Sequence, residues 1–180
     1  MKSVFGSKSV IALLLTISLC GTAWAAPALD MGADSARPGE EVTIPIFLTN
    51  ETGTVVAGAS TDITYDSAYL TPVDATIGPA GSAAGKEVVK NIVEPGLYRV
   101  GVLSTSNVTP VADGLVANIT FMVNNSAPEG TYQLGNHPSC STPQGTPVAT
   151  GGGAGIIEVT SSTTTSEIDE GPNSTTTTTA

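Results

Sequence analysis

An alternation of apolar and polar residues with a period of two constrains the fold of this chain more than any other feature of its sequence. The pattern is clearest over residues 115–123, and beyond the first 25 residues no segment keeps the period of an amphipathic helix. Successive side chains of a β-strand point to opposite faces of a sheet. We therefore expect a strand here that turns Asn118 and Thr120 to water. Its alternate apolar residues are predicted to face a core: Leu115, Ala117, Ile119, Phe121 and Val123.

Similar short apolar runs recur along the chain and are separated by turn signals rich in Gly and Pro. Nine strands are predicted, at 29–34, 42–48, 56–65, 69–77, 87–93, 97–104, 115–123, 130–134 and 155–160. Pro45 lacks a backbone donor, which suggests an edge strand or a bulge. A helical turn is expected within 78–88, and a long irregular loop over 135–154. The chain is thus predicted to be an all-β, antiparallel sandwich or barrel.

The first 25 residues are typical of a cleaved signal peptide. Lys2 and Lys8 precede an apolar run over 10–19, and Ala23-Trp24-Ala25 offers the small residues that a signal peptidase needs. About ten apolar residues are too few for a membrane span, which needs about 20. We therefore expect no membrane span in the mature chain, which would begin at Ala26 and be secreted, extracellular or periplasmic.

The last 20 residues form a different region. Residues 161–180 are mostly Ser and Thr around an acidic cluster at 167–170, and such a segment has little to bury. It is predicted to be a disordered tail. The sandwich would then occupy residues 26–160, and because Cys20 leaves with the signal peptide, Cys140 has no intrachain cysteine to pair with.

Charge and residue types exclude several functions. With 6 Lys and Arg against 16 Asp and Glu, the chain carries a formal charge of −10, which disfavours nucleic acid as a partner. The single histidine, His137, and Cys140 fall in the predicted loop without a nucleophile signature. We predict no catalytic residues, no metal ligands and no cofactor. Carboxylates in loops leave structural calcium open as an alternative, although no twelve-residue calcium loop occurs.

Five segments in order resemble the cohesin domain family, whose members are nine-stranded jelly-roll sandwiches that bind dockerins in secreted polysaccharide-degrading assemblies. The segments are RPGEEVTIPI (37–46), YDSAYL (65–70), GLYRVGVL (96–103), DGLVANITFMV (113–123) and APEGTY (127–132). The resemblance spans about residues 28–160. It implies an antiparallel jelly-roll β-sandwich, a fold that related carbohydrate-binding sandwiches share.

The resemblance also implies where a partner would bind. Alternation over 56–65 places Ala57, Ala59, Thr61, Ile63 and Tyr65 inward and Gly58, Ser60, Asp62 and Thr64 outward. In cohesins this outward row belongs to the dockerin-binding face. We therefore predict Ser60, Asp62 and Thr64 as partner-binding residues, with Arg99 from a neighbouring strand. Cohesins commonly carry Asn and Asp at the positions of Gly58 and Ser60, and a carboxylate near Ser104. A solvated sheet face is the alternative interpretation of this row.

The predicted function is that of a secreted, non-catalytic binding module. Its partner would be a dockerin-like protein or an extracellular polysaccharide, in the context of polysaccharide catabolism. Few aromatic residues remain after Trp24 is removed, and several are needed in the core, which weakens direct sugar binding. The alternative is a structural subunit of an extracellular matrix, surface layer or filament that joins its neighbours through open strand edges.

Overall fold

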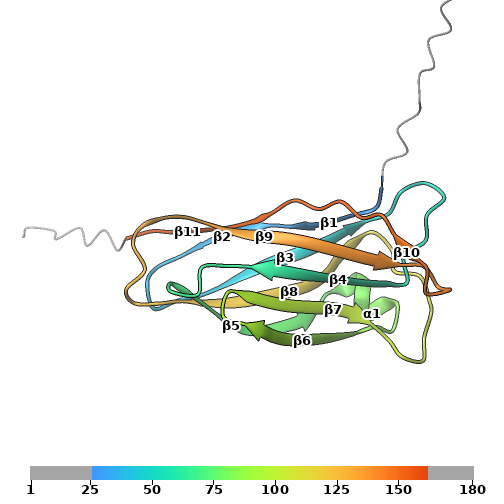
Figure 1. The fold of residues 1–180 in the computed structure, drawn as a ribbon, viewed down its shortest axis with the longest axis horizontal. Coiled ribbons are helices and arrows are strands. Elements are labelled where there is room, and N and C mark those ends of the chain that lie inside the picture. The colour runs from blue at the N-terminus through green and yellow to red at the C-terminus, as the bar shows by residue number, and fades with distance from the viewer. Residues whose placement is uncertain (1–25, 162–180) are drawn as a thin grey trace, which may run out of the picture.

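The computed structural model describes residues 26–161 as a sandwich of two β-sheets (Figure 1). One sheet has the strand order β1-β3-β8-β5, and the other has the order β2-β11-β9-β4-β7-β6, with β10 paired to β9. The strands are β1 (Ala28–Met31), β2 (Ala33–Ala36), β3 (Glu41–Thr49), β4 (Gly58–Thr64), β5 (Leu70–Ile77), β6 (Glu87–Glu94), β7 (Leu97–Leu103), β8 (Gly114–Val123), β9 (Gly130–Ser141), β10 (Pro147–Val148) and β11 (Gly155–Val159). The predicted signal peptide and nearly all of the predicted tail lie outside the described residues.

The predicted fold class is confirmed, with two differences. Residues 26–161 form eleven strands instead of about nine, and β11 pairs with β2 in parallel, whereas the other strand pairs among these residues are antiparallel. The helical turn expected within 78–88 is the helix α1 (Pro79–Ala83), which packs against β8. No helix among residues 26–161 is long and apolar enough to cross a membrane.

Alternation builds the core between the two sheets. In β3, Val42, Ile44, Ile46 and Leu48 are buried, whereas Glu41, Thr43 and Phe47 are exposed. Phe121 of β8 is fully buried at the centre. Its ring packs 5.5 Å from that of Tyr65 and 6.3 Å from that of Tyr98, measured between centroids. Phe121 therefore links β8 of one sheet to β7 of the other.

The predicted orientation of β8 is confirmed except at its first residues. Ala117, Ile119, Phe121 and Val123 are buried, but Leu115 is only half-buried and Val116 takes its place in the core. The cause is a β-bulge, because Ile46 of β3 pairs with Ala117 while the next residue, Phe47, pairs with Leu115. The extra residue reverses the alternation before Ala117.

The predicted strand 29–34 is two strands, because the chain changes sheet at Gly32. β1 pairs with β3 in one sheet, and β2 pairs with β11 in the other. The Gly32 amide donates to the Pro45 carbonyl at 2.8 Å, and a Cβ at Gly32 would lie only 2.7 Å from Pro45 Cγ. Pro45 is neither in an edge strand nor the bulged residue. It lies in β3 between β1 and β8, beside the point where β1 ends.

The prediction of an irregular loop over 135–154 is wrong for its first third and also at β10 (Pro147–Val148), which pairs with β9. β9 continues to Ser141, and residues 135–141 pair with β4 along its whole length. The alternation was hidden because Asn136 and Pro138 occupy inward positions that are usually apolar. His137 and Cys140 are therefore strand residues, which bears directly on the candidate site.

The core assignment predicts a large difference between neighbouring residues of β8. Phe121→Ala should lower the free energy of unfolding by about 3–5 kcal/mol, because it removes a buried ring and leaves a cavity. Asn118→Ala, on the outward side of the same strand, should change it by about 0.5 kcal/mol or less. Urea unfolding measures both. Equal losses for the two variants would mean that the strand is turned the other way.

Candidate functional site

The candidate site is the outer face of the larger sheet, made by the outward residues of β9, β4, β7 and β6. Strand pairing places these residues in four rows that cross the sheet. In the order β9, β4, β7, β6 the rows are Ser141, Gly58, Leu103, Glu87; Ser139, Ser60, Gly101, Val89; His137, Asp62, Arg99, Asn91; and Gly135, Thr64, Leu97, Glu94. The predicted site residues Ser60, Asp62, Thr64 and Arg99 all lie here, in three adjacent rows.

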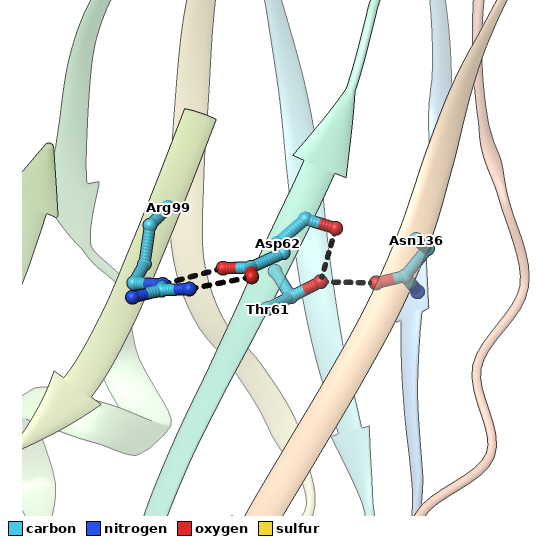
Figure 2. Close-up of polar contacts among 4 residues, drawn as sticks. All are labelled: Thr61, Asp62, Arg99 and Asn136. Carbon is cyan, nitrogen blue, oxygen red and sulfur yellow. Dashed lines mark hydrogen bonds and ion pairs between the residues drawn. The ribbon is translucent and has the colours of Figure 1, made fainter. Parts of the chain in front are cut away.

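Asp62 and Arg99 form an ion pair at the centre of the outer face. They are direct cross-strand partners on β4 and β7, so their side chains leave the sheet side by side. Arg99 Nε donates to Asp62 Oδ1 at 2.6 Å, and Arg99 Nη2 donates to Asp62 Oδ2 at 2.7 Å (Figure 2). Two parallel hydrogen bonds of this kind fix both side chains in one orientation.

The pair also shifts both pKa values. The hydrogen bond from Arg99 lowers the pKa of the Asp62 carboxyl, with a smaller opposing effect of burial, and the same bond raises the pKa of Arg99. Because the folded pKa of Asp62 is depressed, its contribution to stability is present at neutral pH. That contribution is lost as the pH falls through the folded pKa.

A second polar contact lies behind the outer face, between the sheets. Thr61 is 2% exposed, and its hydroxyl donates to Asn136 Oδ1 on β9 at 2.6 Å (Figure 2), with a longer contact of 3.5 Å to the Asp62 carbonyl. Asn136 Nδ2 donates to the carbonyls of Leu29 at 2.6 Å and Gly153 at 2.9 Å. This network joins β4 and β9 to β1 of the other sheet, and it satisfies polar groups that would be costly to bury alone.

Sequence reasoning missed the contribution of β9 to this face. His137 stands directly across from Asp62, and Ser139 stands across from Ser60. Cys140, between Ser139 and Ser141, points inward and is 2% exposed. Burial raises the pKa of its thiol, partly offset by a hydrogen bond with Thr150, so it is a protonated core residue rather than a nucleophile. The polar residues at every second position, His137, Ser139 and Ser141, were the available signal.

Near the ion pair, few side chains project from the outer face. Gly58 and Gly101 contribute no side chain, and a shallow hollow of about 120 Å³ lies among Gly58, Ser60, Leu103 and the serines of β9. Val89 and Leu103 beside it are 54% and 36% exposed. The face thus combines a polar central row with a small apolar area.

The side chains of this face offer little for binding a sugar or a metal ion. None of its four rows contains Trp, Tyr or Phe, and the exposed aromatic residue of the described chain, Phe47, lies on β3 in the other sheet. Within residues 26–161, no three His, Cys, Asp or Glu side chains gather as metal ligands would. Structural calcium bound between loop carboxylates stays a prediction.

A β-sandwich with a polar outer sheet face is an architecture that many binding modules share. The cohesin domain family matches residues 27–159, almost the whole of the described chain. This chain therefore belongs to the cohesin family, whose members are protein–protein interaction modules. The resemblance found in the sequence motifs is confirmed.

Solved cohesins share the fold at low sequence identity. The sixth cohesin of scaffoldin B from Acetivibrio cellulolyticus, in complex with the Cel5 dockerin, is 22% identical with a TM-score of 0.63, covering 76% of this chain and 100% of that chain. A type I cohesin from Clostridium thermocellum, in the complex of OlpA cohesin with dockerin 918, is 18% identical with a TM-score of 0.65, at 76% and 100% coverage.

An archaeal cohesin is similar to the same extent. The non-cellulosomal cohesin of the hyperthermophile Archaeoglobus fulgidus is 17% identical with a TM-score of 0.61, covering 76% of this chain and 93% of that chain. No curated protein matches the chain. At these identities the structural likeness establishes the fold, and the partner has to be argued from this chain's own residues.

The buried polar contact behind the face predicts a specific loss of stability. Thr61→Val keeps the shape of the side chain but removes the donor to Asn136, so the free energy of unfolding should fall by about 1–3 kcal/mol. Thr64→Val, the same change at an exposed position of the same strand, should have an effect of about 0.5 kcal/mol or less. Urea unfolding of the two variants makes the comparison. A Thr61→Val protein as stable as the original would show that the contact contributes nothing.

Proposed function

We propose that this protein is a secreted attachment module that binds a dockerin-bearing protein through the outer face of β9, β4, β7 and β6. The observation that carries the proposal is the central row of that face, where Asp62 and Arg99 are fixed by two hydrogen bonds between polar neighbours. Side chains already held in one conformation lose little entropy on binding, which favours their use in recognition.

The surroundings of this row support a protein partner over a polysaccharide. Sugar-binding faces commonly rely on exposed aromatic rings, and the four rows of the outer face contain no Trp, Tyr or Phe. Serine hydroxyls, a guanidinium and two exposed aliphatic side chains suit a protein surface of mixed polarity. Two of the similar cohesins were solved in complexes with dockerins, which is the ground for naming a dockerin.

We also propose that this attachment takes place outside the cell. Its ground is the order of charged, apolar and small residues over 1–25, which is typical of an exported chain. The similar scaffoldin B cohesin was solved with the Cel5 dockerin. From the resemblance to cohesins we further propose that the chain belongs to an assembly that acts on extracellular polysaccharide, where it would hold a partner without taking part in catalysis.

The proposal predicts that one charge reversal on the outer face strongly reduces capture of the partner. Asp62→Lys sets a second cation beside Arg99 and destroys the pair, so the captured protein should fall at least tenfold. Glu41→Lys makes the same charge change on an exposed residue of β3 in the other sheet and should leave capture unchanged. The measurement is a pull-down from native culture fluid with the original chain and both variants, after circular dichroism shows that they fold.

Two outcomes would contradict the proposal. Equal capture by the original chain and the Asp62→Lys variant would move the interface away from this face, to a strand edge or a loop. Recovery of polysaccharide without any protein would make the chain a carbohydrate-binding module instead.

A further inference from the structure

We infer that the partner offers hydrogen-bond acceptor oxygens to Arg99, and that Asp62 takes part by holding Arg99 in place rather than by contacting the partner. The inference rests on the proposed function, because it concerns the same outer face. It assigns the chemistry of the partner at the centre of the interface, namely carboxylate or carbonyl oxygens. It also assigns different roles to two side chains that lie side by side.

The ion pair engages both carboxylate oxygens of Asp62 but not every N–H donor of Arg99. Oδ1 accepts from Nε and Oδ2 accepts from Nη2, at 2.6 and 2.7 Å. A guanidinium has five N–H groups in a fixed plane, so three of them have no partner in this pair. A donor from a partner would have to share oxygens that already accept short, charge-assisted bonds, whereas an acceptor would find unused N–H groups.

The solvent exposure of the two side chains also favours Arg99 as the group that contacts the partner. The Arg99 side chain is 56% exposed and the Asp62 side chain 31%, so the guanidinium is the more accessible member of the pair. The neighbouring row places Gly101 beside Arg99 on β7, and a glycine adds no side chain between the guanidinium and an approaching partner. A partner that covers this row therefore meets donor atoms first.

The outward side chains of the three central strands also include few negatively charged hydrogen-bond acceptors. Among the outward residues of β9, β4 and β7, Asp62 carries the sole carboxylate. Ser60, Ser139 and Thr64 have hydroxyls that can donate, and Glu87 and Glu94 lie on the edge strand β6 in the first and last rows. His137 is the titratable group that faces Asp62 from β9. The local pattern of donors thus differs from the acidic character of the whole chain.

The test is a set of binding measurements with the protein captured by the original chain, identified from its sequence and then prepared on its own. Arg99→Gln should weaken its binding about ten- to hundredfold, because it removes a charged donor from the interface. Arg99→Lys should recover only part of this loss, since an ammonium cannot bond to Asp62 and to the partner in the geometry of a guanidinium. Arg37→Gln, the same change at an exposed arginine that precedes β3, serves as the matched control and should have no effect.

The decisive variant combines two substitutions. If Asp62 acts only through Arg99, adding Asp62→Asn to Arg99→Gln should weaken binding by less than about twofold more. A further loss of tenfold in the double variant would show that Asp62 contacts the partner itself, and it would overturn the inference. So would an Arg99→Gln protein that binds as well as the original. Either result leaves the proposed function standing, which fails separately if the outer face captures no protein at all.

Discussion

The apolar layer between the two sheets is the constraint on which the rest of the structure depends. Ile63 of β4 and Val100 of β7 are buried in it, so the residues just before them, Asp62 and Arg99, must lie on the opposite side. A slip of one residue would turn every side chain of β4 to the other face. Such a slip would bury the Asp62 carboxylate and expose Ile63, and each change is unfavourable. The geometry of the outer face is therefore a consequence of the core.

Polar residues inside the sandwich add a second, more specific constraint. Asn136 occupies an inward position of β9, and its side chain bonds to Thr61, to Leu29 and to Gly153. Those bonds define how β9 lies against β4 and β1, which apolar packing alone would specify less strictly. The same pairing brings His137 opposite Asp62. In this way a contact that is hidden from the partner arranges residues that the partner would meet.

The orientation of strands whose inward residues are mostly apolar could be predicted from the sequence, whereas strands stabilised by other interactions were missed. β3, β4 and most of β8 alternate regularly, and their orientation followed from that pattern alone, as did the outward direction of Ser60, Asp62 and Thr64. The second half of β9 was missed because hydrogen bonds, not apolar burial, stabilise Asn136 inside. The bulge before Ala117 and the sheet change at Gly32 depend on pairing with β3, residues far away in the sequence. The sequence analysis assigned Arg99 to a strand next to the row of Ser60, Asp62 and Thr64. Its two hydrogen bonds to Asp62 could not be predicted without the pairing register of β4 and β7.

The central claim is that the outer face of β9, β4, β7 and β6 is where this cohesin meets its partner. The most direct measurement is nuclear magnetic resonance of the isotopically labelled chain, titrated with the captured protein. We expect the largest amide shifts along the four rows, around Ser60, Asp62, Arg99 and Ser139, while β3 and β5 of the other sheet change little. Shifts concentrated on β3 and β5, or confined to the loops at the ends of the strands, would contradict it.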